Sequence, residues 1–384
     1  MREYVLVFLV AATVTYLLTV IAREIALRTG AVAKVRDRDV HAEPIPYLGG
    51  LAMLGGLVAA YFLARELPFL SSRSDAFVFR DAGVVLIAGA LICAVGTLDD
   101  LFELDALTKL GGQILAAGFL VFQNVQYIYF SSNDTQFIID PAQGALLTVF
   151  IVVATVNAVN FVDGLDGLAA GVVCIGALAF FAFCYQVTRF NDQSVATTGA
   201  LLSAMLAGAC IGFLPHNINP ARLFMGDSGS MLIGLVLSAS AITLTGQFNP
   251  EEISKGAMGS QASFLVTLLP VLLPLAILVV PLADLVLAVI RRTRAGRSPM
   301  APDKQHLHHR LLEIGHSQRR AVLIMWMWAA LIAFGMVLAS LYTGPLMWGA
   351  LAIMFALTVL MTFVLPVVKK PALLDRESSH AVTP

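Results

Sequence analysis

Charge is scarce in this chain. Only 13% of its 384 residues are Asp, Glu, Lys or Arg, against about 25% in a soluble domain, and 58% are hydrophobic. Apolar runs of about 20 residues recur along the sequence, which is the length that a helix needs to cross a bilayer. The alternation over about 10 residues that is typical of membrane barrels is missing. The composition excludes a soluble domain and predicts an all-α polytopic integral membrane protein.

Several familiar sources of function are absent as well. The four cysteines lie inside apolar runs and form no CxxC pair, so neither a disulfide framework nor a cysteine metal site is indicated. A net charge of −1 gives no reason to expect nucleic acid as a partner. The chain contains no GxxxxGK[ST] loop and no HExxH motif. The first apolar run lacks a small-x-small cleavage site before Arg23, so we expect a retained helix and not a signal peptide.

The apolar runs predict about eleven transmembrane helices. Their expected bounds are 3–22, 48–65, 82–98, 107–124, 141–158, 168–187, 196–214, 228–246, 263–290, 320–341 and 345–367. Pro270, Pro274 and Pro281 predict that the ninth helix is bent or broken, which either opens a lateral groove for a lipid chain or is an ordinary kink. Residues 125–140, rich in β-branched and aromatic side chains around Ser-Asn-Asp, predict a small external β-hairpin.

Most chemically active side chains fall into five polar islands. The islands are 35–50, 99–109, 157–171, 215–230 and 303–316. Eleven crossings place all five on one side of the membrane. That side also carries 18 of the 24 lysines and arginines, so the positive-inside rule puts it in the cytosol. Because ionisable groups near a bilayer are costly and usually functional, the pattern predicts a cytosolic catalytic surface.

One island joins carboxylates to a lysine. Asp99 and Asp100 close the third predicted helix, and adjacent carboxylates in a low-dielectric setting need a shared cation or a raised pKa. They are candidates for Mg²⁺ chelation or for a general base, and Lys109 is available to a phosphate. A solvated helix end with an exposed acidic pair is an equally good account of this island taken alone.

A second island, NAVNFVDGLDGLAAG (157–171), sets acids beside glycines. Gly164 and Gly167 permit a tight turn next to Asp163 and Asp166, and the asparagines at 157 and 160 add neutral oxygen ligands. Its DxxDGxxA string has a superficial likeness to the CDP-alcohol phosphotransferase signature. That signature has Arg where this chain has Gly171, which argues against that family.

Two further islands add an acid and a basic cluster. Asp227 lies between glycines in FMGDSGS, at the entry to the eighth predicted helix, where N-terminal amides favour an anion; alone, it would be a plain N-cap. The largest predicted cytosolic loop carries His306, His308, His309 and Arg310. Imidazoles suit zinc, but the adjacent arginine disfavours a cation. Contact with a phosphate is therefore favoured over a zinc site or a solvated loop.

Together the islands supply oxygen ligands for a hard divalent cation and basic groups for phosphates, as phosphoryl transfer requires, and the setting implies a lipid reactant. The five islands resemble, in sequence and in order, the motifs of the polyprenyl-phosphate N-acetylhexosamine-1-phosphate transferase family, which includes MraY translocases and WecA/TagO enzymes. The resemblance covers nearly the whole chain, from HAEPIPYLGG to HLHHRL. HLHHRL resembles the GlcNAc branch, whereas MraY enzymes carry an HHH-type motif. LDALTK, GFLPHN and RRTRAGRS are most similar to actinobacterial members, which use decaprenyl phosphate.

The resemblance implies a reaction. GlcNAc-1-phosphate passes from UDP-GlcNAc to undecaprenyl or decaprenyl phosphate with Mg²⁺ (or Mn²⁺) as cofactor, UMP is released, and a cell-envelope glycopolymer is begun. By position, Asp227 would be a metal ligand and Asn160 a second one. Asp99 and Asp100 would serve the lipid phosphate, one of them as its base. Direct attack and a covalent aspartyl intermediate are both compatible with these motifs.

The resemblance also implies the substrate contacts. Lys109 and the histidine–arginine cluster at 306–310 would hold the diphosphate, while Asp163 and Asp166 would shape the nucleotide-sugar site. Asn157 and, in the first loop, His41 are further substrate-binding candidates.

Two other functions were weighed for the same motifs. An MraY-type enzyme that takes UDP-MurNAc-pentapeptide is the close alternative. A transporter is the alternative from another class, although transport would place ionisable groups near the bilayer midplane. We expect one transmembrane catalytic domain over 1–368, a polar cytosolic tail over 369–384, and a place in the bacterial inner membrane. A homodimer is compatible with the sequence.

Overall fold

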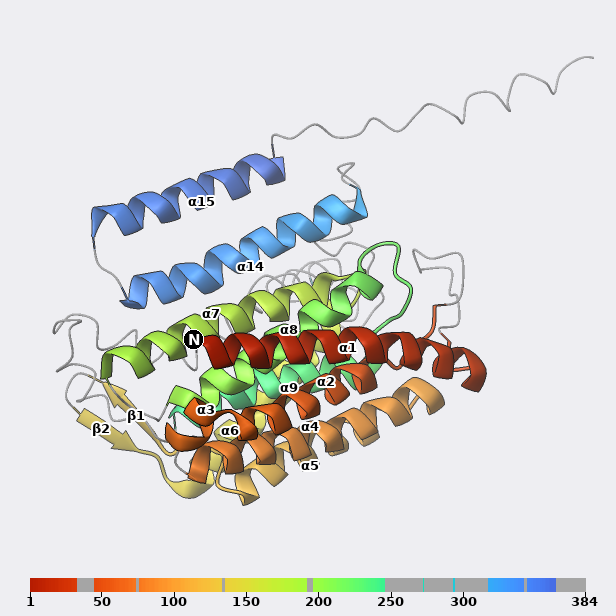
Figure 1. The fold of residues 1–384 in the computed structure, drawn as a ribbon, viewed down its shortest axis with the longest axis horizontal. Coiled ribbons are helices and arrows are strands. Elements are labelled where there is room, and N and C mark those ends of the chain that lie inside the picture. The colour runs from red at the N-terminus through yellow and green to blue at the C-terminus, as the bar shows by residue number, and fades with distance from the viewer. Residues whose placement is uncertain are drawn as a thin grey trace, which may run out of the picture.

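Long helices that run alongside one another form a bundle (Figure 1). The structure is a computed structural model that describes residues 1–32, 45–73, 76–132, 135–191, 196–245, 317–341 and 344–363, with the isolated residues 272 and 293. Its long helices are α1 (Arg2–Thr29), α2 (Gly49–Glu66), α4 (Ala76–Phe102), α5 (Ala106–Phe122), α6 (Pro141–Val162), α7 (Leu168–Asn191), α8 (Thr197–Asn217), α9 (Gly226–Thr245), α14 (Gln318–Leu341) and α15 (Pro345–Phe363). The described part of the chain also contains a short helix, α3 (Pro68–Arg73).

The helices confirm the predicted class of protein. Eight of those described, α1, α4, α6, α7, α8, α9, α14 and α15, are long and apolar enough to cross a membrane. Ten of the eleven predicted spans coincide with described helices, the shorter α2 and α5 among them. The ninth, 263–290, lies outside the described residues apart from residue 272, and the predicted tail, 369–384, lies wholly outside them. The division into domains therefore stays a prediction.

The hairpin predicted within 125–140 is also present. Strands β1 (Tyr129–Ser132) and β2 (Thr135–Ile138) pair antiparallel, with Tyr129 opposite Ile138 and Ser132 opposite Thr135. It connects α5 to α6 at the end of the bundle where α5 finishes and α6 begins (Figure 1).

Several helices extend further than predicted, and two of them reach into the islands that form the site. Helix α4 runs to Phe102 and α6 to Val162, so Asp99, Asp100 and Asn160 lie in final helical turns and not in loops. Hydropathy marks where an apolar run stops, whereas a helix continues until its backbone is interrupted. After α4 this happens at Glu103, whose φ of 52° is left-handed.

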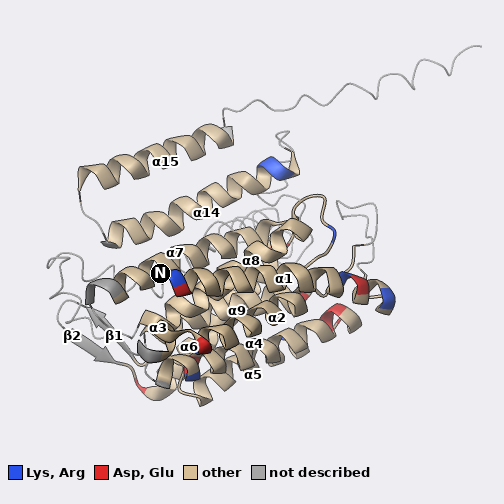
Figure 2. Cartoon of the chain, viewed as in Figure 1, with Lys and Arg blue, Asp and Glu red and all other residues tan. Residues whose placement is uncertain are grey.

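The core of the bundle is formed around α8 and α9, in which almost every described residue is buried. Helix α9 packs against α4 and α6, while α8 packs against α1 and α7; α14 lies on α7, and α15 packs chiefly on α14. Charged residues gather at helix ends and leave the middle of the bundle uncharged (Figure 2). This is the distribution that a hydrocarbon layer requires.

Close packing at the start of α9 depends on glycine. A β-carbon on Gly96 of α4 would lie 2.5 Å from Cα of Ser228 and 2.6 Å from the carbonyl carbon of Asp227. On Gly50 of α2 it would lie 2.7 Å from Cα of Gly229. Small residues let membrane helices approach backbone to backbone, and here they fix where α9 begins relative to α2 and α4.

This contact predicts the effect of one methyl group. We expect Gly96→Ala to lower the thermal unfolding temperature of the detergent-solubilised protein, because overpacking costs about 1–3 kcal/mol. Gly118→Ala on α5 is the matched control, since nothing lies within 4 Å of its β-carbon. It should leave the unfolding temperature unchanged or raise it slightly, because Ala is favoured over Gly in a helix by about 0.5–1 kcal/mol. Equal stability of the two variants would contradict the packing.

Candidate functional site

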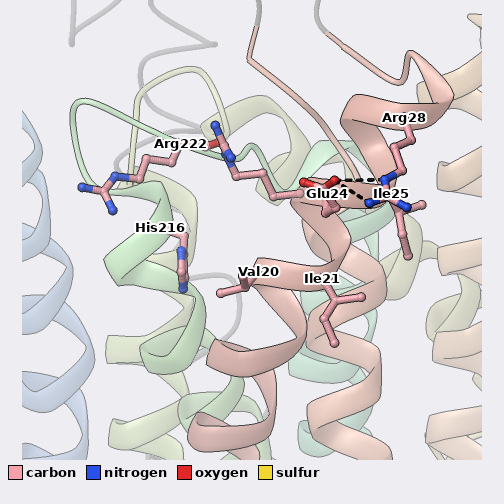
Figure 3. Close-up of a pocket in the computed structure, with 8 residues that line it drawn as sticks. Val20, Ile21, Glu24, Ile25, Arg28, His216 and Arg222 are labelled. Atoms are coloured by element: carbon pink, nitrogen blue, oxygen red, sulfur yellow. Dashed lines mark hydrogen bonds and ion pairs between the residues drawn. The ribbon is translucent and has the colours of Figure 1, made fainter.

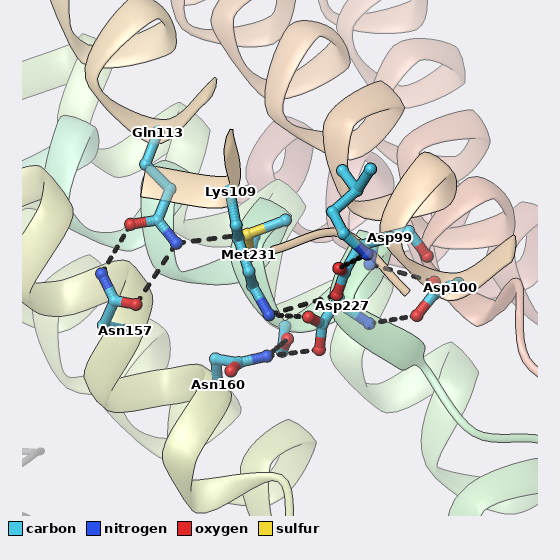
Figure 4. Close-up of polar contacts among 11 residues, drawn as sticks. Asp99, Asp100, Lys109, Gln113, Asn157, Asn160, Asp227 and Met231 are labelled. Atoms are coloured by element: carbon cyan, nitrogen blue, oxygen red, sulfur yellow. Dashed lines mark hydrogen bonds and ion pairs between the residues drawn. The ribbon is translucent and has the colours of Figure 1, made fainter. Parts of the chain in front are cut away.

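Four helix ends meet at one end of the bundle and bring three predicted islands together (Figure 4). Asp99 and Asp100 come from the last turn of α4, Lys109 from the first turn of α5, Asn160 from the last turn of α6, and Asp227 from the first turn of α9. The islands 99–109, 157–171 and 215–230 thus lie on the same side of the membrane-spanning bundle, as predicted.

Lys109 is the centre of this cluster. Its Nζ donates to Oδ2 of Asp99 at 3.3 Å and also forms an ion pair with Oδ2 of Asp227. The three side chains are 20%, 16% and 24% exposed respectively, so they are largely shielded from solvent. Because a shielded charge is costly unless it is paired, one ammonium draws together two carboxylates from different helices.

The other oxygen of Asp227 is held by an amide. Nδ2 of Asn160 donates to Oδ1 of Asp227 at 2.6 Å and to Oγ of Ser230 at 2.9 Å. Asn160 therefore orients the carboxylate of Asp227 between α5 and α6. Its own Oδ1 accepts no hydrogen bond within the described residues, which leaves an oxygen donor beside the carboxylate.

Asp100 has a different set of partners from its neighbour Asp99. Its Oδ1 accepts from the backbone N–H of Asp227 at 2.7 Å, and its Oδ2 accepts from the backbone N–H of Ser228 at 3.2 Å. A carboxylate on α4 therefore caps the N-terminus of α9, where helix amides favour an anion. A β-carbon at Gly226, whose φ is +68°, would lie 2.7 Å from Cγ of Asp100. Glycine at this position admits the carboxylate.

The pair of acids in the turn after α6 is also divided. Asp166 is buried, and its Oδ2 accepts from Nδ2 of Asn219 at 3.0 Å and from the backbone N–H of Ala221 at 3.1 Å. It ties this turn to the segment before α9. Burial raises the pKa of Asp163 well above its ordinary range, and the nearby carboxylates of Asp100 and Asp166 raise it further. A protonated carboxyl there can donate to a substrate oxygen.

A second polar layer lies one turn deeper in the bundle (Figure 4). Nδ2 of Asn157 donates to Oε1 of Gln113 at 2.6 Å, and Nε2 of Gln113 donates to Oδ1 of Asn157 at 3.3 Å and to Sδ of Met231 at 3.5 Å. Asn157, predicted to bind substrate, is thus paired with a protein amide. Gln113 was not among the site residues predicted from the sequence. Its signal was a lone amide in an apolar helix, four residues after Lys109 and so on the same helix face.

Five predicted site residues lie outside the described part of the chain. They are His41, His306, His308, His309 and Arg310. Their roles stay predictions.

The donor set fits a magnesium ion. Within the described residues no group of three His, Cys, Asp or Glu side chains is arranged to hold a metal. Magnesium does not require one, since it is commonly held by one or two carboxylates together with water and substrate phosphates. Asp227 and Asp99 offer carboxylate oxygens and Asn160 an amide oxygen. The ammonium between the two carboxylates marks a position that already accommodates a cation.

Known proteins with similar sequences show which family the chain belongs to. Residues 82–245 match glycosyl transferase family 4. The chain is 49% identical over 351 residues to the decaprenyl-phosphate N-acetylglucosaminephosphotransferase of Mycobacterium tuberculosis (strain ATCC 25618 / H37Rv), covering 90% of this chain and 84% of the relative. It is 31% identical over 365 residues to the probable undecaprenyl-phosphate N-acetylglucosaminyl 1-phosphate transferase of Bacillus subtilis (strain 168), covering 95% and 92%.

A third relative is more distant in sequence. The undecaprenyl-phosphate alpha-N-acetylglucosaminyl 1-phosphate transferase of Escherichia coli (strain K12) is 30% identical over 335 residues, covering 85% of this chain and 81% of the relative. The chain is thus a multi-pass membrane enzyme of the phosphotransferase class. It belongs to glycosyl transferase family 4, among the polyprenyl-phosphate N-acetylhexosamine-1-phosphate transferases that its motifs predicted.

The cap on α9 gives a stability prediction. Asp100→Ala removes both acceptors of the α9 amides and should lower the thermal unfolding temperature, at a cost of about 1–3 kcal/mol. Asp100→Asn keeps one acceptor oxygen and should lose less. Asp105→Ala is the control, because Asp105 is an exposed N-cap that accepts from the backbone N–H of Thr108 at 3.3 Å within its own helix. If Asp105→Ala destabilises the protein as much as Asp100→Ala, the cap between helices is unimportant.

Proposed function

We propose that this chain transfers GlcNAc-1-phosphate from UDP-GlcNAc to a polyprenyl phosphate and releases UMP, as the first step of a cell-envelope glycopolymer. The observation that carries the proposal is the joint site of Lys109, Asp99 and Asp227 at one end of the bundle. There a lipid phosphate from the membrane and a water-soluble sugar nucleotide can meet. The names of the relatives support both the polyprenyl phosphate acceptor and the N-acetylglucosamine phosphate group.

The bonds exchanged explain why this site suits the reaction. An oxygen of the lipid phosphate forms a bond to the phosphorus that carries GlcNAc. The bond from that phosphorus to the bridging oxygen breaks, and UMP leaves with this oxygen. Catalysis of such a transfer depends mainly on positioning and on neutralising phosphate charge. We assign Lys109 to the diphosphate oxygens, because its ammonium lies where two carboxylates converge.

We further propose that Asp227, with Asn160, holds Mg²⁺, for which Mn²⁺ can substitute, and that Asp99 faces the same ion. When bound, the ion would neutralise the diphosphate and fix its orientation. Asp99 is itself held in place, since its Oδ1 accepts from the backbone N–H of Leu104 at 2.9 Å. Asn160 keeps the carboxylate of Asp227 in one orientation, so the ligand is arranged before substrate arrives.

We place the site on the cytosolic side of the bacterial inner membrane. The distribution of lysine and arginine supports this orientation, because the predicted loops on the side of the site carry most of them. The transporter alternative is disfavoured by the position of the charges. Asp99, Lys109 and Asp227 lie in terminal helical turns, while the deeper layer of Gln113, Asn157 and Met231 is uncharged.

The donor is the first thing to test. We expect bacterial membranes that contain the chain to transfer label from radiolabelled UDP-GlcNAc into decaprenyl or undecaprenyl phosphate, with one UMP released for each labelled lipid. Membranes without the chain are the control. Transfer from UDP-MurNAc-pentapeptide and not from UDP-GlcNAc would replace the proposal with the MraY-type alternative.

Asp227 should be indispensable. Asp227→Asn keeps the size of the side chain and removes its charge, so we expect UMP release to fall by roughly 10²–10³-fold or more with little change in unfolding temperature. Asp140→Asn is the matched control. Asp140 caps α6 by accepting from the backbone N–H of Ala142 at 2.9 Å, at the end of α6 opposite to Asn160. Near-normal turnover of Asp227→Asn would remove this residue from the proposed metal site.

Metal removal tests the cofactor. EDTA should abolish UMP release from the purified enzyme, and Mg²⁺ or Mn²⁺ should restore it, because the described donors are all oxygens and oxygen donors suit these ions. Restoration by Zn²⁺ alone would instead favour a metal site at the histidine cluster at 306–309.

A further inference from the structure

A pocket of about 800 Å³ lies between the last turns of α1 and the end of α8 (Figure 3). Its lining shares no residue with the site around Lys109. Arg23 and Arg28 from α1, Arg222 from the segment between α8 and α9, and His216 from α8 give it a basic rim. Val20, Ile21 and Ile25 of α1 add an apolar wall. A pocket with one basic side and one apolar side is suited to an amphipathic anion.

The charge of this pocket is only partly balanced. Arg28 pairs with Glu24 at 2.9 Å, one turn before it on α1. Arg23 and Arg222 have no carboxylate within ion-pair distance in the described part of the chain. Nε of Arg23 donates to the backbone oxygen of Arg222 at 3.3 Å, which holds α1 beside the segment that carries the second arginine. Two arginines therefore line the same pocket with no carboxylate paired to either of them among the described residues.

A buried nitrogen also lacks a partner at this pocket. Nε2 of His216 is buried and makes no hydrogen bond within the described residues. The imidazole ring packs against Tyr16, with ring centroids 4.7 Å apart. Buried polar atoms nearly always have a hydrogen-bonding partner, from protein, solvent or ligand.

The length of α1 sets the depth of the pocket. Twenty residues of helix cover roughly 30 Å, which is the thickness of the hydrocarbon core, so a span that begins at Glu3 leaves the core near Ala22. Arg23 and Arg28 then lie at the level of the lipid headgroups. Val20 and Ile21, which are 53% and 54% exposed, lie just inside the hydrocarbon. The boundary between the apolar wall and the basic rim coincides with the boundary of the membrane.

We propose that this pocket binds the phosphate headgroup of an anionic phospholipid. The phosphate lies between Arg23 and Arg222, whose planar guanidinium groups match its oxygens, and the acyl chains run along Val20 and Ile21. The apolar wall favours a lipid over a soluble phosphate, which would leave that wall in water. The proposal does not depend on the reaction assigned to the other site.

Competition between two lipids tests the proposal. The full-length protein is reconstituted in nanodiscs of equal parts phosphatidylglycerol and phosphatidylcholine, and the lipids that stay bound after transfer to detergent are counted by native mass spectrometry. We expect the wild type to retain phosphatidylglycerol in preference to phosphatidylcholine. Arg23→Gln/Arg222→Gln should reduce this preference roughly five- to thirtyfold, because arginines near an anionic lipid contribute additively. Arg2→Gln/Arg65→Gln, which removes two charges at the opposite helix ends, should keep it within about twofold.

Each other outcome overturns the proposal. Equal retention of the two lipids by the wild type, an unchanged preference in the pocket variant, or the same loss in the control variant would each do so. Displacement of phosphatidylglycerol by inorganic phosphate at equal concentration would show a site for soluble anions. The unfolding temperature checks that the double variant is folded. If it is not, Arg222→Gln alone serves, because the Arg222 side chain makes no hydrogen bond within the described residues, and about a fivefold loss is expected.

Discussion

The ion pairs of Lys109 are the constraint around which the site is arranged. A lysine and two aspartates are each largely shielded from water there, and removal of the lysine would leave the two carboxylates facing each other with no counter-charge between them. The set needs the start of α5, the end of α4 and the start of α9 in one place. Gly96 and Gly226 supply that geometry, since a side chain on either would push α4 away from α9. The glycine contacts and the ion pairs of Lys109 thus both require the end of α4 and the start of α9 to lie close together.

The acidic residues differ in what their oxygens contact. Asp100 and Asp166 accept from backbone amides, which cannot leave without unfolding a helix start or a turn. Asp99 and Asp227 each have one oxygen on the ammonium of Lys109, which ends a long flexible side chain and can turn toward a phosphate. The other oxygen of Asp99 accepts from the backbone N–H of Leu104. Substrate or metal can therefore exchange partners with the second pair at little structural cost. Asp100 and Asp166 therefore hold backbone segments together in this structure. The catalytic roles predicted for them, as for Asp99 and Asp227, stay predictions.

Sequence predicted the helices better than the contacts of single residues. The length of an apolar run indicates a membrane crossing directly, so ten of the predicted spans coincide with described helices. The number of crossings between the islands then predicted that they share one side of the membrane. Asp99 and Asp100 looked equivalent because adjacent residues carry the same chemistry. On a helix they point about 100° apart, and so one meets Lys109 while the other meets α9. The pocket is lined by Arg23, His216 and Arg222, which come from segments distant in the chain. No local sequence pattern predicts that such segments lie side by side.

The polar residues of the site lie in two layers, an outer one that carries charge and an inner one that does not. Lys109, Asn160 and Asp227 form the outer layer, while Gln113, Asn157 and Met231 lie one turn further into the same three helices. The two amides of the inner layer satisfy each other, and beneath them α5 continues as an apolar helix. The described helices place no charged side chain in the middle of the bundle beneath this inner layer, and burial of an unpaired ion is costly. Among the described helices the charges of the site therefore lie at the end of the bundle, which is where the reaction proposed above would take place.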